Sequence, residues 1–426
     1  MRMSRVRSAQ LSDSGSVPAR LGSQRFKRIL VLSNCYPFPP TNGIALRVWA
    51  ILQVLAKSGH DLDLLCFGDP GTVPQDRAAL KTCKSVQIVP RPLAWSEHTA
   101  LIRRAAALPF ARPFGVARAR SKAMADAILD HLRRGSCDVV LCEEADLLVN
   151  VPDCLPVPLI VDHHNVEHVL LGRYSAQETN PLRRAYAQLE ARKVLNWERL
   201  ATRRADIALV CSEVDRATYQ QLCPSAAVIV APNVIDIDAY TPGVGEEPES
   251  ILYTGGMDWY PNRDAVEFFA LSVLPRIRRS VPTARLIVAG RSPAPEFRRR
   301  FAGLPFIEFT GAVPDMRPLI TRAAVCVVPL RVGSGTRLKI LEAAAMARPV
   351  VSTTIGAEGL SFTDAREILL ADDADTFAAA VVALLNDPQR RASMSAAARQ
   401  RVESNYTLVA LSAALHDALQ VLASRI

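Results

Sequence analysis

Short runs of β-branched and other apolar residues alternate with helix-like patterns along most of this chain, and this alternation constrains the fold more than any other feature. Runs of this length between amphipathic stretches are typical of parallel strands buried under layers of helices. A first series lies at 28–33, 60–67, 138–142, 158–162, 206–211 and 228–231, and a second at 251–255, 285–290, 306–311, 324–329, 349–352 and 367–370. The sequence therefore predicts an α/β protein with two doubly wound, Rossmann-like domains.

The two series are separated by a stretch at 232–250 that lacks periodicity and is rich in Pro, Gly and Glu. We therefore expect an N-terminal domain at 26–231, a linker at 232–250 and a C-terminal domain at 251–404. A final helical pattern predicts a C-terminal helix at 405–426 that can pack back on the N-terminal domain. Residues 1–25 are polar and basic, which predicts a disordered tail and neither a signal peptide nor a mitochondrial helix.

Composition limits the class of protein and its compartment. A length of 426 residues with 49% hydrophobic and 22% charged residues is a normal balance for globular domains. The nine cysteines form no C-x-x-C pair, so we expect reduced thiols in a cytoplasmic protein. No apolar run approaches the roughly 18 to 20 residues of a membrane-spanning helix. An aromatic content of 6% argues against a nucleic acid partner.

A basic stretch at 101–134 raises the question of a membrane surface. Its basic side chains are interleaved with apolar residues and face only Asp126 and Asp130. This combination suits the headgroup region of an anionic membrane, which would place the protein at the inner face of the cell membrane. The alternative is a solvated helix face with ordinary core contacts, and both interpretations stay open.

A glycine-rich segment at 329–352 carries the strongest functional signal. Its residues predict a strand end, a glycine loop, a short helix and the next strand. Such a loop presents free backbone N–H groups and a positive helix end to an anion, and Arg337 and Lys339 add charge. Glu342 lies about two turns into the helix, where it can accept hydrogen bonds from a ribose diol. The segment predicts a nucleotide site, whereas the alternative for Glu342 is an ion pair with Lys339.

Candidate residues also follow two strands of the first series, at the sheet edge where open parallel sheets bind ligands. After the first strand, Asn42 and Gly43 precede a helix, so their backbone N–H groups are expected near the cleft floor. After the fourth strand, His164 is expected to project into the cleft, with Asp162 or Glu167 orienting it. The alternative for His164 is a loop histidine satisfied by its neighbours.

No pattern in the chain predicts a metal site. His163, His164 and His168 lack both an H-E-x-x-H arrangement and a set of cysteine partners. The three D-x-D pairs fall on a strand, in the linker and at a helix start, at 61/63, 236/238 and 373/375. We therefore expect no metal in the site.

The order and spacing of these motifs resemble the family 4 nucleotide-sugar glycosyltransferases, which have the GT-B fold of two Rossmann-like domains facing each other across a cleft. The resemblance covers residue 28 to the C-terminus and rests on the loop at 37–43, on His60, and on 162–165, 232–233, 255–257, 289–290, 310–313 and, above all, 335–352. It implies that the C-terminal domain binds the activated sugar donor and that the N-terminal domain holds the acceptor. It also implies retention of the anomeric configuration, with no obligatory metal and no other cofactor.

The resemblance assigns roles to matching positions. Glu342 is similar to the glutamate that takes the ribose hydroxyls. Gly311 to Val313 match the loop beside the base. The loop around the diphosphate matches Gly335, Thr336, Arg337 and Leu338. The chain departs from the family at Ser334, where many members carry a glutamate that contacts the donor sugar. Asn262 stands where a basic residue would help to neutralise the leaving diphosphate. We therefore expect Arg337 and Lys339 to supply that positive charge instead. The catalytic candidates are therefore His164, Arg337 and Lys339.

Together these expectations describe a retaining transferase that moves a sugar from a nucleoside diphosphate to a saccharide or lipid-linked acceptor, in exopolysaccharide or lipopolysaccharide biosynthesis. Because Ser334 replaces the usual glutamate, two alternatives stay open, a non-catalytic nucleotide-sugar-binding scaffold and a GT-B nucleotide-sugar epimerase. A nicotinamide dehydrogenase is disfavoured, because no G-x-G-x-x-G motif follows the first strand.

Overall fold

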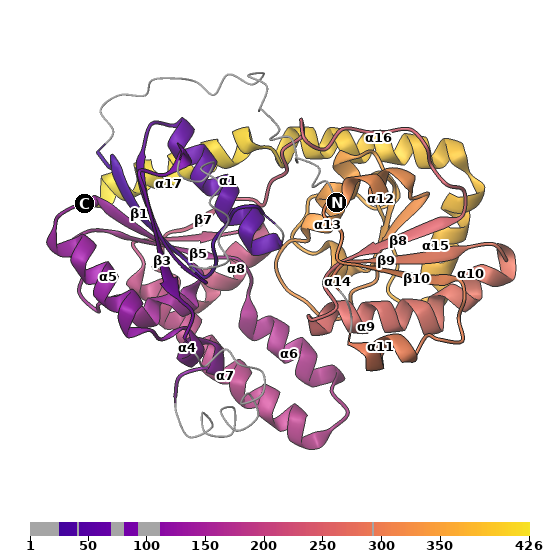
Figure 1. Ribbon diagram of the computed structural model, residues 1–426, viewed down its shortest axis with the longest axis horizontal. Coiled ribbons are helices and arrows are strands. Elements are labelled where there is room, and N and C mark those ends of the chain that lie inside the picture. Colours follow the sequence, from indigo (N-terminus) through magenta and orange to yellow (C-terminus); the bar gives the residue numbers. More distant parts are fainter. Residues whose placement is uncertain (1–24, 41, 70–80, 93–110, 292–293) are drawn as a thin grey trace, which may run out of the picture.

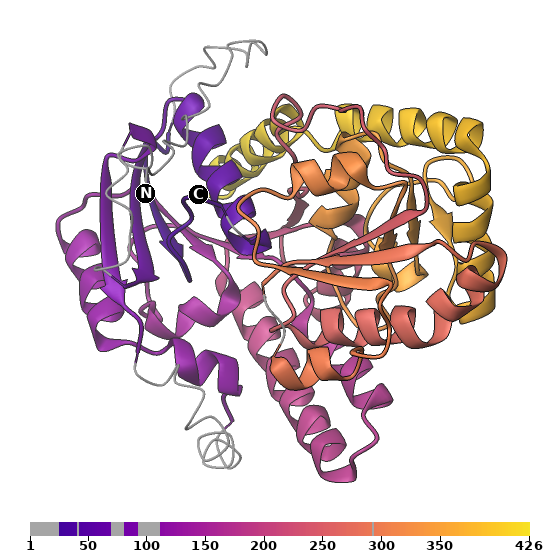
Figure 2. The ribbon, with the colours of Figure 1, turned by 45° about the vertical axis from the view of Figure 1, so that its right-hand side comes forward.

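The computed structural model describes residues 25–40, 42–69, 81–92, 111–291 and 294–426, which form two α/β domains (Figure 1). The tail expected at 1–25 lies outside these residues, except for Arg25. Each domain is built on one parallel sheet flanked by helices, which is the architecture that the alternating sequence pattern predicts. The turned view in Figure 2 shows both sheets with their helical layers.

The N-terminal domain has a seven-stranded sheet in the order β3-β2-β1-β4-β5-β6-β7. Its strands are β1 (Arg28–Ser33), β2 (Asp61–Gly68), β3 (Ser85–Pro90), β4 (Val139–Glu143), β5 (Leu159–His163), β6 (Ile207–Val210) and β7 (Val228–Val230). Its helices are α1 (Gly43–Lys57), α4 (Phe114–Ala119), α5 (Lys122–Arg133), the 3-10 helix η3 (Ala145–Asn150), α6 (Glu167–Gln177), α7 (Pro181–Arg204) and α8 (Glu213–Leu222). The edge strand β3 is not among the predicted runs, because half of its side chains are exposed and its sequence is not continuously apolar.

The C-terminal domain has a six-stranded sheet in the order β10-β9-β8-β11-β12-β13. Its strands are β8 (Ser250–Thr254), β9 (Arg285–Ala289), β10 (Ile307–Gly311), β11 (Val325–Val328), β12 (Val350–Ser352) and β13 (Leu369–Leu370). Its helices are α9 (Tyr260–Phe268), the π-helical turn η4 (Phe269–Val273), α10 (Leu274–Ser280), α11 (Pro295–Arg299), α12 (Arg317–Arg322), α13 (Leu338–Ala345), α14 (Thr354–Ala357), α15 (Ala374–Asn386) and α16 (Pro388–Asn405). The last helix, α17 (Leu408–Arg425), follows directly.

The central strands are apolar throughout because both of their faces are buried. In β1, Ile29 and Val31 join the core on one side of the sheet, and Leu30 and Leu32 join the core on the other. Burying a side chain of this size contributes about 1.5–3 kcal/mol. This two-sided burial makes the strands recognisable as continuous apolar runs.

The chain crosses between the domains twice. The first crossing follows β7, and the second joins α16, which packs on α13, to α17, which returns to α1 of the N-terminal domain (Figure 1). The two crossings touch, since the N–H of Ile235 donates to the carbonyl of Tyr406 at 2.9 Å. Leu411, Leu415 and Leu422 of α17 are buried in the N-terminal core.

One helical segment, Pro388–Arg425, is long and apolar enough to cross a membrane by length and composition. The expectation that no apolar run approaches this length stays a prediction, because the segment qualifies only by length and composition. The segment comprises α16 and α17, and 22% of its most apolar window is buried. The buried leucines of this segment lie on the part of α17 that packs on the N-terminal core.

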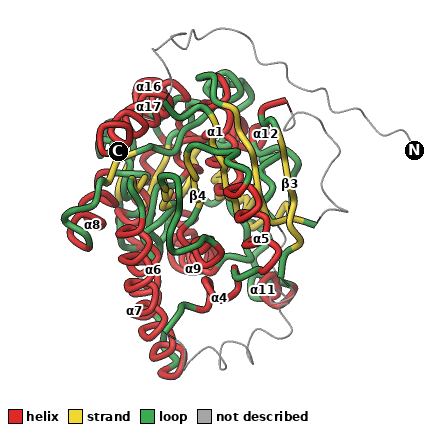
Figure 3. The backbone as a smooth tube through the Cα atoms, turned by 90° about the vertical axis from the view of Figure 1, so that its left-hand side faces the viewer, coloured by secondary structure: helices red, strands yellow, loops and turns green. Residues whose placement is uncertain are grey.

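Helices α6 and α7 form a hairpin that projects from the N-terminal domain (Figures 1 and 3). Asn180 caps the long helix, because its Oδ1 accepts from the N–H groups of Leu182 and Arg183 at 3.0 and 3.1 Å. The shorter helix, α6, reaches the C-terminal domain, where Arg173 forms an ion pair with Glu358 at 2.6 Å.

Candidate active site

The glycine loop at 333–337 joins the end of β11 to the start of α13, at the edge of the sheet that faces the other domain. Gly335 has a φ of 73°, a conformation that favours glycine. A Cβ at Gly335 would lie 2.4 Å from Oδ1 of Asn165 and 2.9 Å from the carbonyl oxygen of His164. Glycine therefore allows this loop to approach the carboxyl end of β5 closely.

Two cations stand in this loop and at the start of α13. Arg337 donates to two backbone carbonyls of its own loop, while its Nη2 is buried without a partner. Nζ of Lys339 donates to the hydroxyl of Tyr253 at 3.1 Å and to Oδ1 of Asn262 at 3.2 Å. Neither cation forms an ion pair with a carboxylate of the described chain. Burial lowers the pKa of Arg337 to about 10 and that of Lys339 to about 7.

The contact between Lys339 and Asn262 gives a geometric basis for the predicted substitution, because the lysine of α13 reaches the asparagine of α9. Ser334 lies in the same loop and is 3% exposed, and its hydroxyl has no hydrogen-bond partner among the described residues. An unpaired buried hydroxyl costs free energy. The loop thus holds an unpaired hydroxyl and uncompensated positive charge, a combination suited to an anion.

Glu342 lies little more than one turn into α13, closer to the helix start than the sequence suggests. Its Oε1 accepts a hydrogen bond from the hydroxyl of Tyr240 at 2.9 Å. Burial raises the pKa of Glu342, although the bond from Tyr240 opposes this effect. The alternative ion pair with Lys339 is not formed, since Lys339 turns to Tyr253 and Asn262.

The two predicted loops face each other across the domain boundary. A Cβ at Gly43, the first residue of α1, would lie 3.5 Å from Leu338 of α13. Asn233 donates to the hydroxyl of Thr336 at 2.7 Å. The side chain of Asn42 caps α1 by accepting from a backbone N–H of its first turn at 3.0 Å. The structure therefore brings Asn42 and Gly43 beside the donor-loop candidates.

Glycines end three neighbouring strands of the C-terminal sheet. A Cβ at Gly290 would lie 2.0 Å from the carbonyl oxygen of Gly255, so close backbone packing requires glycine there. Gly290 also donates to the carbonyl of Gly311 at 3.2 Å, and Val313 follows half-buried at the same edge. The spacing of strands places β10 about 14 Å from β11. Gly311 and Val313 thus lie at the far end of the edge that carries the loop at 333–337.

His164 stands in a cluster of buried charges at the end of β5. Its Nε2 lies 2.9 Å from Oε2 of Glu143 and 3.2 Å from Oδ2 of Asp162. Arg47 of α1 closes the cluster with two hydrogen bonds of 2.6 Å to Asp162. Burial lowers the pKa of His164, but its bonds to Asp162 and Glu143 outweigh burial and raise the pKa to about 10. The imidazole is therefore cationic at neutral pH.

The other candidates near this strand have different partners. Glu167, expected as an orienting group, accepts from Nδ2 of Asn165 at 3.0 Å and forms no hydrogen bond with His164. Of the two expected orienting groups, Asp162 therefore contacts the ring and Glu167 does not, while Glu143 of the neighbouring strand β4 takes the second place beside it. His163 is 3% exposed and stacks on Tyr219 with a ring distance of 4.2 Å, and burial lowers its pKa to about 4. It is a neutral core residue.

Glu143, Asp162 and His164 bring three potential metal ligands within 4.8 Å of one another. Arg47 already binds both oxygens of Asp162 and also donates to the carbonyl of Ala231 at 2.9 Å. A guanidinium in this position supplies the positive charge that the carboxylates need. The expectation of a site without metal stays a prediction.

Glu144 and Asn34 lie beside His164, and sequence reasoning did not single them out. Asn34 donates to Oε2 of Glu144, whose Oε1 lies 3.8 Å from Nδ1 of His164. Glu144 has a φ of 78°, a strained conformation for a residue with a side chain. Oδ1 of Asn34, Oε1 of Glu143 and Nδ1 of His164 are buried without a hydrogen-bond partner among the described residues. Such atoms point to a polar ligand, and the paired acids ending β4 were the available sequence signal.

Helix α6 contacts the glycine loop from the opposite domain. Arg173 donates to the carbonyl of Gly333 at 2.6 Å as well as to Glu358. Gln177, one turn further on, donates to the carbonyl of Arg331 at 3.0 Å. The loop conformation therefore depends on contacts from both domains.

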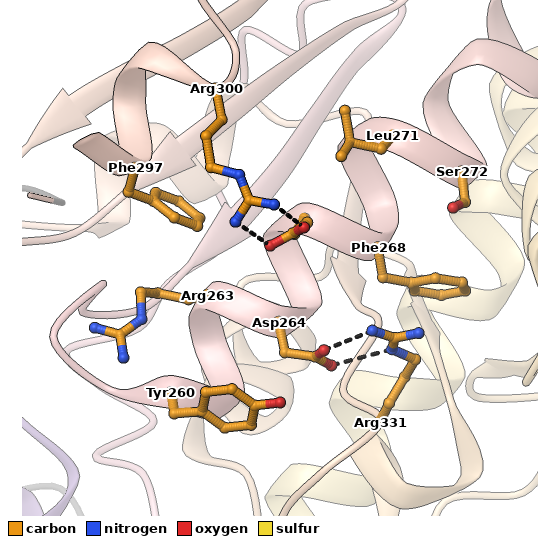
Figure 4. Close-up of a pocket in the computed structure, with 10 residues that line it drawn as sticks. Tyr260, Arg263, Asp264, Phe268, Leu271, Ser272, Phe297, Arg300 and Arg331 are labelled. Carbon is orange, nitrogen blue, oxygen red and sulfur yellow. Dashed lines mark hydrogen bonds and ion pairs between the residues drawn. The ribbon is translucent and has the colours of Figure 1, made fainter. Parts of the chain in front are cut away.

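A separate hollow of about 520 Å³ lies beside α9 in the C-terminal domain (Figure 4). Its aromatic lining comes from Tyr260, Phe268 and Phe297, and its charges include the ion pairs Arg300–Glu267 and Arg331–Asp264. None of the predicted site residues lines it. Because those four charges are paired, the hollow differs from the electropositive loop at 333–337.

Comparison with known proteins gives the same division into two parts. Residues 41–239 match the family model described as glycosyltransferase family 4, and residues 248–387 match glycosyl transferases group 1. Glycogen synthase of Mycobacterium tuberculosis is 26% identical over 409 residues, covering 89% of this chain and 91% of the relative. A phosphatidyl-myo-inositol mannosyltransferase of Mycolicibacterium smegmatis is 28% identical over 204 residues, covering 46% of this chain and 52% of the relative.

Solved structures share the arrangement of the two domains. Sucrose-phosphate synthase from Thermosynechococcus elongatus aligns with a TM-score of 0.70 at 18% identity, covering 94% of this chain and all of the other. HepE from Anabaena, solved with UDP and glucose, aligns with a TM-score of 0.66 at 13% identity, covering 93% and 99%. These likenesses show the GT-B fold. The two family matches, which together span most of residues 41–387, establish that this chain belongs to the family 4 glycosyltransferases.

Proposed function

We propose that this glycosyltransferase moves a sugar from a nucleoside diphosphate to a saccharide or lipid-linked acceptor, with retention of the anomeric configuration. The observation that carries the proposal is the pair of buried cations, Arg337 and Lys339, that stand without carboxylate partners among the described residues. Negative charge grows on the diphosphate as the glycosidic bond breaks. Cations already in place therefore stabilise the transition state more than the ground state.

The donor lies along the edge of the C-terminal sheet in this proposal. The diphosphate occupies the loop at Gly335 and Thr336, the ribose hydroxyls donate to Glu342, and the base reaches Gly311 and Val313. The distance of about 14 Å between the two ends of this edge supports a ligand as long as a nucleoside diphosphate. The unpaired hydroxyl of Ser334 then contacts the donor in place of the usual glutamate.

His164 acts as a hydrogen-bond donor in this proposal. Its Nε2 faces two carboxylates, so the unpartnered Nδ1–H is the group available to a ligand. A cationic ring repels an oxocarbenium-like carbon but stabilises a sugar hydroxyl or a phosphate oxygen. We therefore assign His164 to the leaving-group side and not to the support of the developing sugar cation.

Glu144 and Asn34 hold the attacking hydroxyl of the acceptor in the same proposal. Glu144 Oε1 accepts a hydrogen bond from that hydroxyl, and the free Oδ1 of Asn34 accepts another from the acceptor sugar. The acceptor oxygen forms a bond to the anomeric carbon as the bond to the phosphate oxygen breaks. The hydroxyl proton passes to the departing diphosphate, so the step needs no metal and no cofactor.

Known relatives guide the choice of acceptor. They include a glycogen synthase and a phosphatidyl-myo-inositol mannosyltransferase, so saccharide and lipid-linked acceptors are both candidates for this chain. We place the reaction in exopolysaccharide or lipopolysaccharide assembly, in the cytoplasm. Membership of a transferase family favours transfer over the scaffold and epimerase alternatives.

Membrane contact through the basic stretch at 101–134 is part of this proposal, but its described portion supports it weakly. Residues 101–110 lie outside the described residues. In the remainder, α5 exposes Asp126 and Asp130 together with its basic side chains, and Arg134 pairs with Asp130 at 2.6 Å. No large apolar side chain is exposed between 111 and 134.

A thermal-shift screen tests the donor assignment. UDP, GDP, ADP and their sugar conjugates are added to the purified chain with and without EDTA. We expect one nucleoside diphosphate to raise the melting temperature regardless of chelator, because a ligand of the folded state stabilises it. The sugar conjugate of the same nucleotide then serves as donor in a transfer assay. A shift that requires a divalent ion, or no shift at all, would contradict the proposal.

A further inference from the structure

We propose that the outer face of α7 docks on an anionic lipid surface. Exposed side chains follow one another along a single stripe of this helix, at Leu182, Ala185, Leu189, Arg192, Asn196, Leu200 and Arg203. Their spacing of three or four residues places them on one side of the helix. Leu182 is 81%, Leu189 37% and Leu200 45% exposed. Because Leu182 and Leu200 are 18 helical steps apart, the leucines are distributed along about 27 Å.

Charge is segregated on this helix. The carboxylates of Glu190 and Glu198 are buried and engaged, the first with the N–H of Phe114 and the second with the N–H of Glu167. The solvent side carries exposed Arg183, Arg184, Arg192 and Arg203 and no exposed carboxylate. The side chains of Arg183, Arg192 and Arg203 form no hydrogen bond or ion pair within the described chain. Positive charge with interspersed leucines complements anionic headgroups above an apolar layer.

The shape of the hairpin suits a surface. The α6–α7 hairpin projects from the body of the molecule (Figures 1 and 2), and the outer side of α7 is exposed along its length. Arginines separate the leucines, and arginine stems can follow the leucines into the interface while the guanidinium groups stay among phosphates. A subunit interface would bury these guanidinium groups without a carboxylate on the same face, which is unfavourable. The stripe therefore fits a lipid surface better than a second copy of the chain.

This face differs from the basic stretch that the sequence highlights. On α5, exposed Asp126 and Asp130 offset the basic side chains, whereas α7 exposes arginine and leucine together. The partner helix α6 contacts the donor loop through Arg173 and Gln177. Docking of α7 would thus bring the cleft beside the lipid surface. The inference holds for the apo protein and does not depend on the proposed chemistry.

Vesicle co-sedimentation of the full chain tests the inference, in the absence of donor and acceptor. The vesicles contain phosphatidylcholine alone or equal parts of phosphatidylcholine and phosphatidylglycerol. The test variant combines Arg183→Gln, Arg192→Gln and Arg203→Gln. The matched control combines Arg279→Gln, Arg366→Gln and Arg390→Gln, which removes the same charge from exposed positions of the C-terminal domain, away from both α7 and the stretch at 101–134. We expect the test variant to bind anionic vesicles more than about tenfold more weakly than the wild type, and the control to lose much less.

A second variant, Leu182→Ser with Leu189→Ser, tests the apolar part. It should also lose affinity at physiological salt, where electrostatic attraction is partly screened. If the test and control variants lose equal affinity for anionic vesicles, net charge alone drives binding and the inference is overturned. A wild type that does not bind these vesicles would also overturn it. Sedimentation velocity showing a dimer that the leucine variant dissociates would assign the face to a subunit contact instead. Unchanged melting temperatures establish that all variants are folded.

Discussion

At the scale of single residues, the site is marked by groups that the apo protein leaves unsatisfied. Arg337 and Lys339 carry buried charge without a carboxylate, and Ser334 and His164 each hold a buried polar atom without a hydrogen bond in the described chain. A folded protein keeps such groups at a cost in stability. A polar or anionic ligand that meets these groups removes this cost.

Lys339→Met should therefore separate stability from binding. Loss of a buried unpaired cation should stabilise the apo protein by about 1 kcal/mol. The affinity for the nucleoside diphosphate should fall by about tenfold or more, because a charge-assisted contact to phosphate is lost. Melting curves and isothermal titration measure the two effects, and a variant that binds as tightly as the wild type would exclude Lys339 from the phosphate site.

The lowered pKa of Lys339 predicts that the stability of the fold depends on pH, and Lys339→Met should remove this dependence. Burial lowers the pKa of Lys339 from 10.5 to about 7, so the folded protein binds fewer protons than the unfolded chain between these values. The wild type should therefore gain stability from this group as the pH rises from about 7 to about 10, and Lys339→Met should not. His164, with its raised pKa, acts in the opposite direction in both proteins, so their difference isolates the lysine. Urea unfolding of both proteins across this range provides the check.

Glu144 offers a test of strain at the acceptor side. Glu144→Gly should relieve its left-handed backbone and stabilise the fold by about 1 kcal/mol. Glu144→Gln retains the strain and the shape of the side chain. Both variants should bind donor normally and transfer about tenfold or more slowly, because the attacking hydroxyl loses its acceptor in the glycine variant and the negative charge of that acceptor in the glutamine variant. Normal turnover in the glutamine variant would remove the carboxylate from the mechanism.

The positions of the candidate site residues were only partly predictable from the sequence. The glycine loop singled out Arg337, Lys339 and Glu342 because their signal is local, within one turn and one helix. Glu143 and Glu144 were missed, because their importance arises from the pairing of β4 with β5, which brings them beside His164. Contacts between strands far apart in the chain are not visible in a local pattern.

At the scale of elements, burial decides which side chains a helix presents to a partner, and the sequence does not show burial directly. The stretch at 101–134 and α7 both mix arginine with apolar residues. Only the packing shows that α5 buries its large apolar side chains, Met124 and Ile128, while α7 buries its carboxylates and exposes leucines. Among the described residues, α7 thus presents the more suitable surface, and membrane contact through the stretch at 101–134 stays a prediction.

The contacts of α6 should stabilise the conformation of the loop that we propose binds the donor. Glu358→Gln weakens the ion pair that holds Arg173 beside Gly333, so we expect nucleotide affinity to fall by about threefold while stability changes by less than about 1 kcal/mol. Isothermal titration measures the affinity. Arg276→Gln serves as control, because it removes a surface ion pair with Asp375 that lies away from the loop. Equal effects of both substitutions would contradict a specific role for α6.

At the scale of the whole molecule, the two-domain architecture was predictable because buried parallel strands give long apolar runs. The return of α17 to the N-terminal domain places residues near position 415 in a core formed mainly by residues before 235. Leu415→Ala should therefore destabilise the fold by about 2–5 kcal/mol, with little change in nucleotide affinity. Denaturant unfolding and titration provide the two readouts. Val421→Ala, on the exposed side of α17, should cost less than about 0.5 kcal/mol.

The touching crossings at Ile235 and Tyr406 restrict how the domains can move. A body attached at one point can turn in any direction, whereas one attached at two neighbouring points swings about the line between them. Arg173 and Tyr174 contact the C-terminal domain from α6, which lies on the side of the domain boundary away from α16 and α17 (Figure 1). A swing about that line would separate the domains most at these contacts. The space between the domains would then open as a wedge toward α6, and substrates would enter and leave from that side.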